Sequence, residues 1–97
     1  MNKQMNEKLI REEKRQSDGY IYSYMLIERR GRRMADFGMR LYSIAVSMTD
    51  ENGITKNGEA RDVFSSKRKA LEFFDKIVRN LATPIDLKYV VEDEITV

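Results

Sequence analysis

Residues 66–86, SKRKALEFFDKIVRNLATPID, decide the fold of this 97-residue chain. Apolar side chains recur here every three or four residues, the spacing that gives an α-helix one buried face. Ser65 or Ser66 can cap a first helix, and Thr83 followed by Pro84 is typical of the start of a second one. We therefore predict helices at about 66–80 and 84–93. Their expected buried residues are Ala70, Leu71, Phe74, Ile77, Val78 and Leu81, then Leu87, Val90 and Val91.

The sequence before these helices has the composition of β-strands. Residues 20–27 and 37–48 are rich in aromatic and aliphatic side chains without a helical period. A third, more charged strand is expected from Ile54 or Glu59 to Phe64. Three strands followed by two helices predict an α+β fold, in which both helices pack on one face of a three-stranded antiparallel sheet.

Alternation along each strand sorts the side chains between the two faces of the sheet. In the second strand, one side is consistently apolar and is expected to face the helices: Tyr42, Ile44, Val46 and Met48. The first strand is apolar on both sides. If Ile21, Met25 and Ile27 face the helices, the opposite side places an aromatic row on the helix-free face: Tyr20, Tyr22 and Tyr24. The inverse assignment makes these tyrosines core residues.

The length of the chain is that of one domain. Residues 1–18 are charged and carry few apolar side chains, so we predict a tail or a frayed helix there, followed by a single domain at 19–97. No apolar stretch approaches the roughly 20 residues that span a bilayer, and no secretory signal is apparent. We expect a cytoplasmic protein without a membrane partner.

Several segments together resemble a family of small Firmicutes (clostridial-type) proteins of unknown function. They are Tyr22-Ser-Tyr-Met-Leu-Ile-Glu28, Tyr42-Ser-Ile-Ala-Val46, Asp62-Val-Phe-Ser65 and Thr83-Pro-Ile-Asp-Leu-Lys-Tyr-Val-Val-Glu-Asp93. The last follows a Thr-Pro-x-x-Leu-x-x-Val-Val-Glu-Asp helix that recurs in the family. This chain departs from the pattern at Asp86, where histidine is common, and at Lys88, where the family has an acidic residue. The resemblance implies the order of elements and supplies no activity.

The composition removes most familiar catalytic and metal-binding chemistry. The chain has no cysteine and no histidine, so its side chains supply no Cys/His zinc site, no cysteine nucleophile and no histidine base. A hard-cation site from Asp86 with Glu92, Asp93 and Glu94 is disfavoured, because consecutive residues diverge around a helix. We expect no enzyme activity, no metal and no cofactor.

Three groups of residues are candidates for binding a partner. Arginines surround Gly31 at the first hairpin connection, tyrosines recur along the first strand, and cations occupy the first turn of the first helix. The candidates are Arg29, Arg30, Arg32 and Arg33; Tyr20, Tyr22 and Tyr24; and Lys67, Arg68 and Lys69. Arginine suits phosphate, and tyrosine is enriched at protein interfaces and also stacks on bases.

These features predict a small non-enzymatic interaction or regulatory module. The leading hypothesis is self-association, as a homodimer, through the helix-free face of the sheet, because exposed aromatic patches usually mark protein contacts. The alternative is a nucleic-acid-binding protein that uses the arginine-rich loop and the tyrosine face. The net charge of +2 gives no bulk attraction to nucleic acid.

Overall fold

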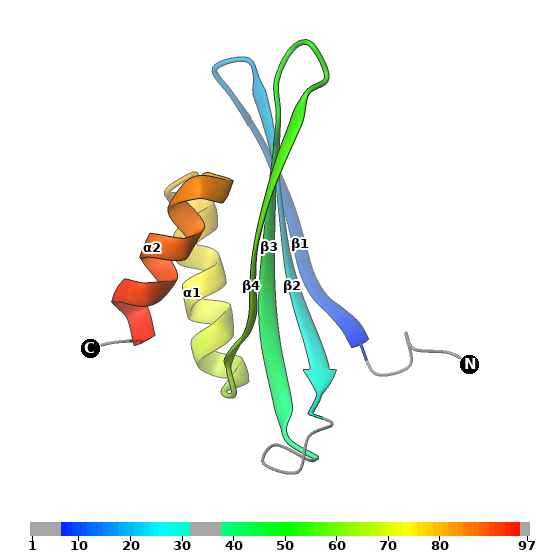
Figure 1. The fold of residues 1–97 in the computed structure, drawn as a ribbon, viewed down its shortest axis with the longest axis vertical. Helices are drawn as coiled ribbons and strands as arrows, with labels where there is room; N and C mark the ends of the chain where they lie inside the picture. The colour runs from blue at the N-terminus through cyan, green and yellow to red at the C-terminus, as the bar shows by residue number, and fades with distance from the viewer. Residues whose placement is uncertain (1–6, 32–37, 96–97) are drawn as a thin grey trace.

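The computed structural model describes residues 7–31 and 38–95, in which four strands are followed by two helices (Figure 1). The elements are β1 (Glu7–Ser17), β2 (Tyr20–Arg30), β3 (Arg40–Thr49), β4 (Thr55–Phe64), α1 (Lys67–Arg79) and α2 (Pro84–Ile95). The strands form one antiparallel sheet in the order β1-β2-β3-β4, and both helices lie on one side of it. The predicted α+β class and helix placement are confirmed, but the sheet has four strands and not three.

The additional strand, β1, occupies the segment for which a tail or frayed helix was expected. It pairs with β2 along its whole length through a turn at Asp18 and Gly19. Both turn residues have positive φ, 51° and 81°, which is the backbone of a two-residue hairpin whose twist matches its strands. An Asp-Gly pair favours this conformation, so the hairpin had a local sequence signal that the charged composition of the strand obscured.

The other connections follow similar local rules. Gly53 turns the chain between β3 and β4 at φ 83°, and the Asp50 carboxylate accepts the backbone N–H groups of Asn52 and Ile54. Ser66 caps α1 by accepting the N–H of Lys69 at 3.3 Å. Thr83 and Asp86 cap α2 reciprocally, since each side chain accepts the backbone N–H of the other residue. The helix starts predicted from the sequence are therefore confirmed.

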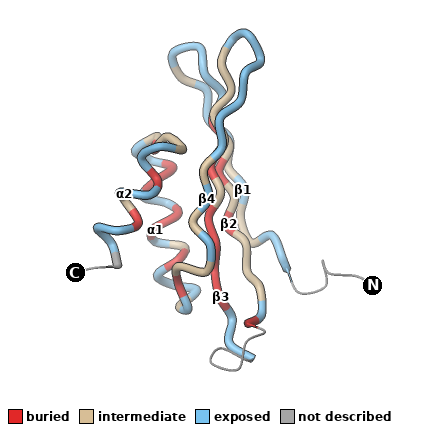
Figure 2. The backbone as a smooth tube through the Cα atoms, viewed as in Figure 1, coloured by how far each residue is buried: buried red, intermediate tan, exposed pale blue. Residues whose placement is uncertain are grey.

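The core lies between the sheet and the helices, where the buried parts of β2, β3 and α1 face one another (Figure 2). Leu26 and Ile44 pair across β2 and β3, and Phe74 and Ile77 cover them from α1. Phe73, which was not among the predicted buried residues, is also buried and contacts Phe64 with ring centroids 5.2 Å apart. Leu71 and Val90 are only partly buried, at the margins of this core.

The start of α2 packs directly on the backbone of β4 at Gly58. A Cβ atom at this position would lie 2.6 Å from the Pro84 carbonyl oxygen and 3.0 Å from the Pro84 Cα. We expect Gly58→Ala to lower the free energy of unfolding by about 1 to 3 kcal/mol, because backbone atoms must move to admit the methyl group. Urea unfolding measures this change. Glu59→Ala, at the next and exposed residue, is the control; equal stability of the two variants would contradict the close approach.

Candidate protein-interaction face

The side of the sheet away from the helices has no covering element among the described residues, and we call it the open face (Figure 1). Tyr22, Tyr24 and Leu26 of β2 are buried against the helices, so the residues between them point to the open face. The register and alternation place the following residues there: Leu9, Glu12, Lys14 and Gln16 of β1; Ile21, Ser23, Met25 and Ile27 of β2; Ser43, Ala45, Ser47 and Thr49 of β3; Thr55, Asn57 and Glu59 of β4.

The tyrosine row therefore lies on the helix side, so the first of the two assignments was wrong and the inverse one, with Ile21, Met25 and Ile27 away from the helices, is correct. Tyr24 is fully buried and donates a hydrogen bond of 2.9 Å to the carbonyl of Ala82, between the helices. Tyr22 is 9% exposed and stacks on Tyr24, with ring centroids 6.3 Å apart. Tyr20 is 37% exposed. β2 is apolar on both sides, so alternation alone does not say which side is buried. Its tyrosine side faces the helices because those side chains have the volume to fill the space beneath them.

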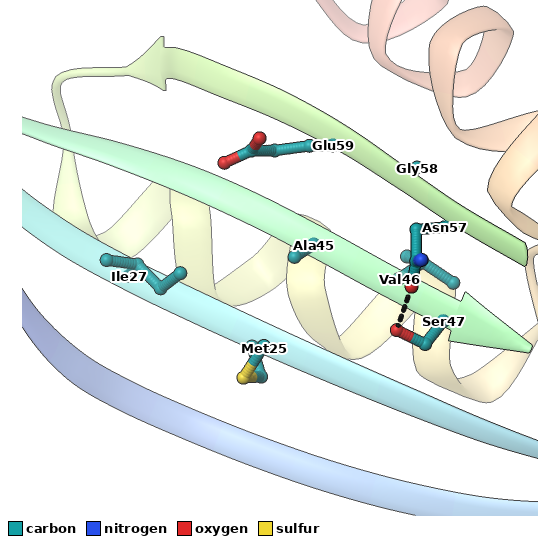
Figure 3. A pocket seen from close by; sticks show the side chains of 8 residues that line it. All are labelled: Met25, Ile27, Ala45, Val46, Ser47, Asn57, Gly58 and Glu59. Carbon is teal, nitrogen blue, oxygen red and sulfur yellow. Dashed lines mark hydrogen bonds between the residues drawn. The ribbon is translucent and has the colours of Figure 1, made fainter. Parts of the chain in front are cut away.

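The open face combines an apolar ridge with a shallow hollow (Figure 3). Met25 and Ile27 stand on β2, and the hollow lies beside them over Ala45 of β3, bounded by Asn57 and Glu59 of β4. The hydroxyl of Ser47 donates to the Asn57 side-chain oxygen at 2.7 Å, which satisfies two polar groups within the surface. Small side chains on β3 next to large ones on β2 make this relief.

Two further apolar side chains extend the ridge and are well exposed. Leu9 and Ile21 are each 51% exposed, and Leu9 lies opposite Ile27 in the β1–β2 pairing. Charged residues of both signs flank the ridge, with Glu12 and Lys14 on β1 and Glu59 on β4. An apolar centre with a polar rim is the arrangement that protein interfaces use.

One end of the open face is closed by a cluster of polar side chains. Asp62 lies in an irregularity of β4 with φ 53°, and its carboxylate accepts two hydrogen bonds from the Arg29 guanidinium, one of them at 2.8 Å. The Asp62 backbone N–H donates to the Ser43 hydroxyl at 2.8 Å. Arg29, a predicted partner-binding residue, is thus held across the sheet by a bidentate ion pair.

The other described candidates for partner binding are not part of the open face. Arg30 is exposed at the end of β2, and Arg32 and Arg33 lie outside the described residues. Lys67, Arg68 and Lys69 begin α1 on the helix side of the sheet, and Arg68 pairs with Glu72 at 3.1 Å. Of the described candidates, Arg29 and Arg30 end β2, the tyrosines lie in its first half with Tyr22 and Tyr24 buried, and the three cations belong to α1.

Two of the acidic residues that were weighed as cation ligands have structural partners within the described chain. Asp86 caps the helix, and Glu94 pairs with Lys76 of α1 at 3.3 Å. Among residues 7–31 and 38–95, no cluster of three carboxylates is arranged to hold a metal ion. Within the same ranges, neither helix has the length and apolar character needed to cross a bilayer.

A protein-family model described as "Family of unknown function (DUF6514)" matches residues 2–97. The chain belongs to this family. No curated protein and no solved structure matches it. The match to the DUF6514 family covers the segment of β1 as well as the helices, so the charged N-terminal strand is part of the matched region.

Sequence reasoning identified the correct side of β3 but missed the residues that form the ridge. The leading interpretation turned Ile21, Met25 and Ile27 towards the helices, with the inverse left open, and placed Leu9 in a tail. The signal that could have found them is the Asp18-Gly19 pair, since it aligns β1 with β2 and places Leu9, Glu12 and Lys14 beside the aliphatic side of β2.

Proposed function

We propose that this protein is a small non-enzymatic interaction module that binds protein through the open face. The observation that carries the proposal is the exposure of Leu9 and Ile21 beside Met25 and Ile27 on a sheet face without a covering helix. A two-layer α+β domain buries one sheet face under its helices, and a second apolar face is then available to a partner. The resemblance to clostridial-type proteins supports a bacterial setting for this role.

The chemistry of the open face favours protein over nucleic acid. Its apolar side chains are aliphatic and offer no aromatic plane on which bases stack, because Tyr22 and Tyr24 are buried on the other side. Glu12 and Glu59 would repel phosphates, and Arg29 is engaged by Asp62. The rim residues of the open face on β1 and β4 are Glu12, Lys14, Gln16, Asn57 and Glu59. Among these five, Lys14 is the one cation.

A photo-crosslinking amino acid at Ile21 in cells of the native host tests the proposal. We expect protein adducts whose yield falls at least about tenfold when Met25→Glu places a charge at the centre of the face. Tyr89, which is 60% exposed on α2, is the matched control position and should give few adducts that respond to Met25→Glu. Adducts formed equally from both positions, or adducts to nucleic acid, would contradict a protein-binding open face.

A further inference from the structure

We infer that the partner of the open face is a second copy of this chain, packed face to face about a two-fold axis that crosses the strands. This inference rests on the proposed function and names the occupant of the same surface. The register supports it, because the open face consists of cross-strand rows. One central row is Glu12, Met25, Ala45 and Glu59, and the other is Lys14, Ser23, Ser47 and Asn57. One outer row is Gln16, Ile21, Thr49 and Thr55, and the other includes Leu9, Ile27 and Ser43.

The proposed two-fold axis lies in the plane of the interface, runs along the rows and passes midway between the two central rows. Each central row of one copy therefore faces the other central row of the second copy. On β1, Glu12 then lies opposite Lys14 of the second copy, and Lys14 lies opposite the partner's Glu12. On β2, Met25 meets the small Ser23, and Ile21 meets Ile27. Opposite charges, a large with a small side chain, and two aliphatic side chains are thus matched at the same time, within the roughly 10 Å that separates packed sheets.

A second orientation of the two-fold axis would also stack the two open faces, but the charges disfavour it. An axis parallel to the strands places β1 over the partner's β4, which sets Glu12 level with Glu59 of the second copy. Like charges at this distance in a partly buried interface disfavour the pairing. Within the described part of the chain, neither Glu12 nor Lys14 has an ion-pair partner, so both are available for pairing between copies.

The size of the face also fits a dimer. Four strands about 4.8 Å apart, each about ten residues long at about 3.4 Å per residue, present a face of roughly 650 Å². This value approaches the roughly 800 Å² per partner that specific protein interfaces bury. The aliphatic ridge runs along β2, with charged residues on β1 and on β4 to either side of it, and the burial on association would include Leu9 and Ile21.

Charge exchange between Glu12 and Lys14 tests the arrangement by sedimentation velocity at concentrations up to about 100 μM. We expect wild-type dimers and a loss of affinity of at least about tenfold in Glu12→Lys and in Lys14→Glu, since each variant sets like charges opposite each other twice. The double variant restores both pairs and should return to within about threefold of wild type. An equimolar mixture of the two single variants should form heterodimers, because each then supplies the charge that the other needs.

Circular dichroism melting shows that each variant is folded, so that a loss of affinity reports on the interface. A monomeric wild type, or single variants that neither the double exchange nor mixing rescues, would overturn the inferred dimer. If wild type is monomeric while the crosslinks from Ile21 to another protein still depend on Met25, the proposed function stands and only the second copy is excluded. Loss of both results would overturn both.

Discussion

Replacing Phe74 with alanine is expected to lower the free energy of unfolding by about 3 to 5 kcal/mol. The Phe74 ring is fully buried between α1 and the sheet, and the Arg11 guanidinium of β1 lies 5.7 Å from its centroid. Removing the ring therefore opens a cavity and also removes a contact between α1 and the edge strand. Domains of this size have total stabilities near 5 to 15 kcal/mol, so the loss is a large share of the whole.

Chemical denaturation at neutral pH measures the effect of Phe74→Ala. Glu72→Ala, on the exposed side of the same helix, is the matched control and should change the stability by less than about 0.5 kcal/mol. If the alanine variant is unfolded without denaturant, Phe74→Leu gives a smaller, measurable loss of about 1 kcal/mol. An unchanged midpoint for both Phe74 variants would remove this residue from the core.

Alkaline pH is expected to destabilise the protein through Tyr24. Burial raises the pKa of the Tyr24 hydroxyl from 10.0 to about 12, and the neighbouring Tyr22 adds to the shift. The pKa is higher in the folded than in the unfolded state, so the stabilising contribution is complete below pH 10. It is lost as the pH rises from 10 towards 12, by about 2 to 3 kcal/mol in all. The phenolate also loses the hydrogen bond to the Ala82 carbonyl.

Urea unfolding of wild type and Tyr24→Phe at pH 8, 10, 11 and 12 checks this expectation. The phenylalanine variant should be less stable at pH 8, by about 1 kcal/mol, and should lose less stability above pH 10. Some alkaline loss remains in the variant, because burial and the hydrogen bond to Glu28 also raise the pKa of Tyr42. Equal losses in wild type and variant between pH 10 and 12 would show that Tyr24 does not cause the effect.

The helices and their starts were predictable because their signals are local. Ser66, Thr83 and Pro84 act on backbone groups within one turn, and the spacing of Phe74, Ile77 and Val78 defines a buried side without reference to the sheet. Phe73 escaped prediction because it lies beside this stripe, and only the position of Phe64 at the end of β4 makes its burial favourable.

The sheet was harder to predict because its pattern depends on partners distant in sequence. β1 consists largely of charged residues, where a buried strand would have β-branched ones. It is held at the edge of the sheet by pairing with β2 and by the ion pair of Arg11 with Asp75 on α1. β2 is apolar on both sides, so alternation alone could not say which side the helices cover. The position of Asp62, which holds Arg29 across β3, depends on a strand irregularity with no clear sequence signal.

The strand order also bears on how the chain is made. Since each strand pairs with its neighbour in sequence, the three hairpins close short loops and can form while synthesis proceeds from the N-terminus. The apolar side that carries Tyr24, Leu26 and Ile44 has no cover until residues 67–95 have left the ribosome. Until then the nascent sheet exposes aliphatic or aromatic side chains on both faces, and this interval is the one in which the chain most needs protection from aggregation.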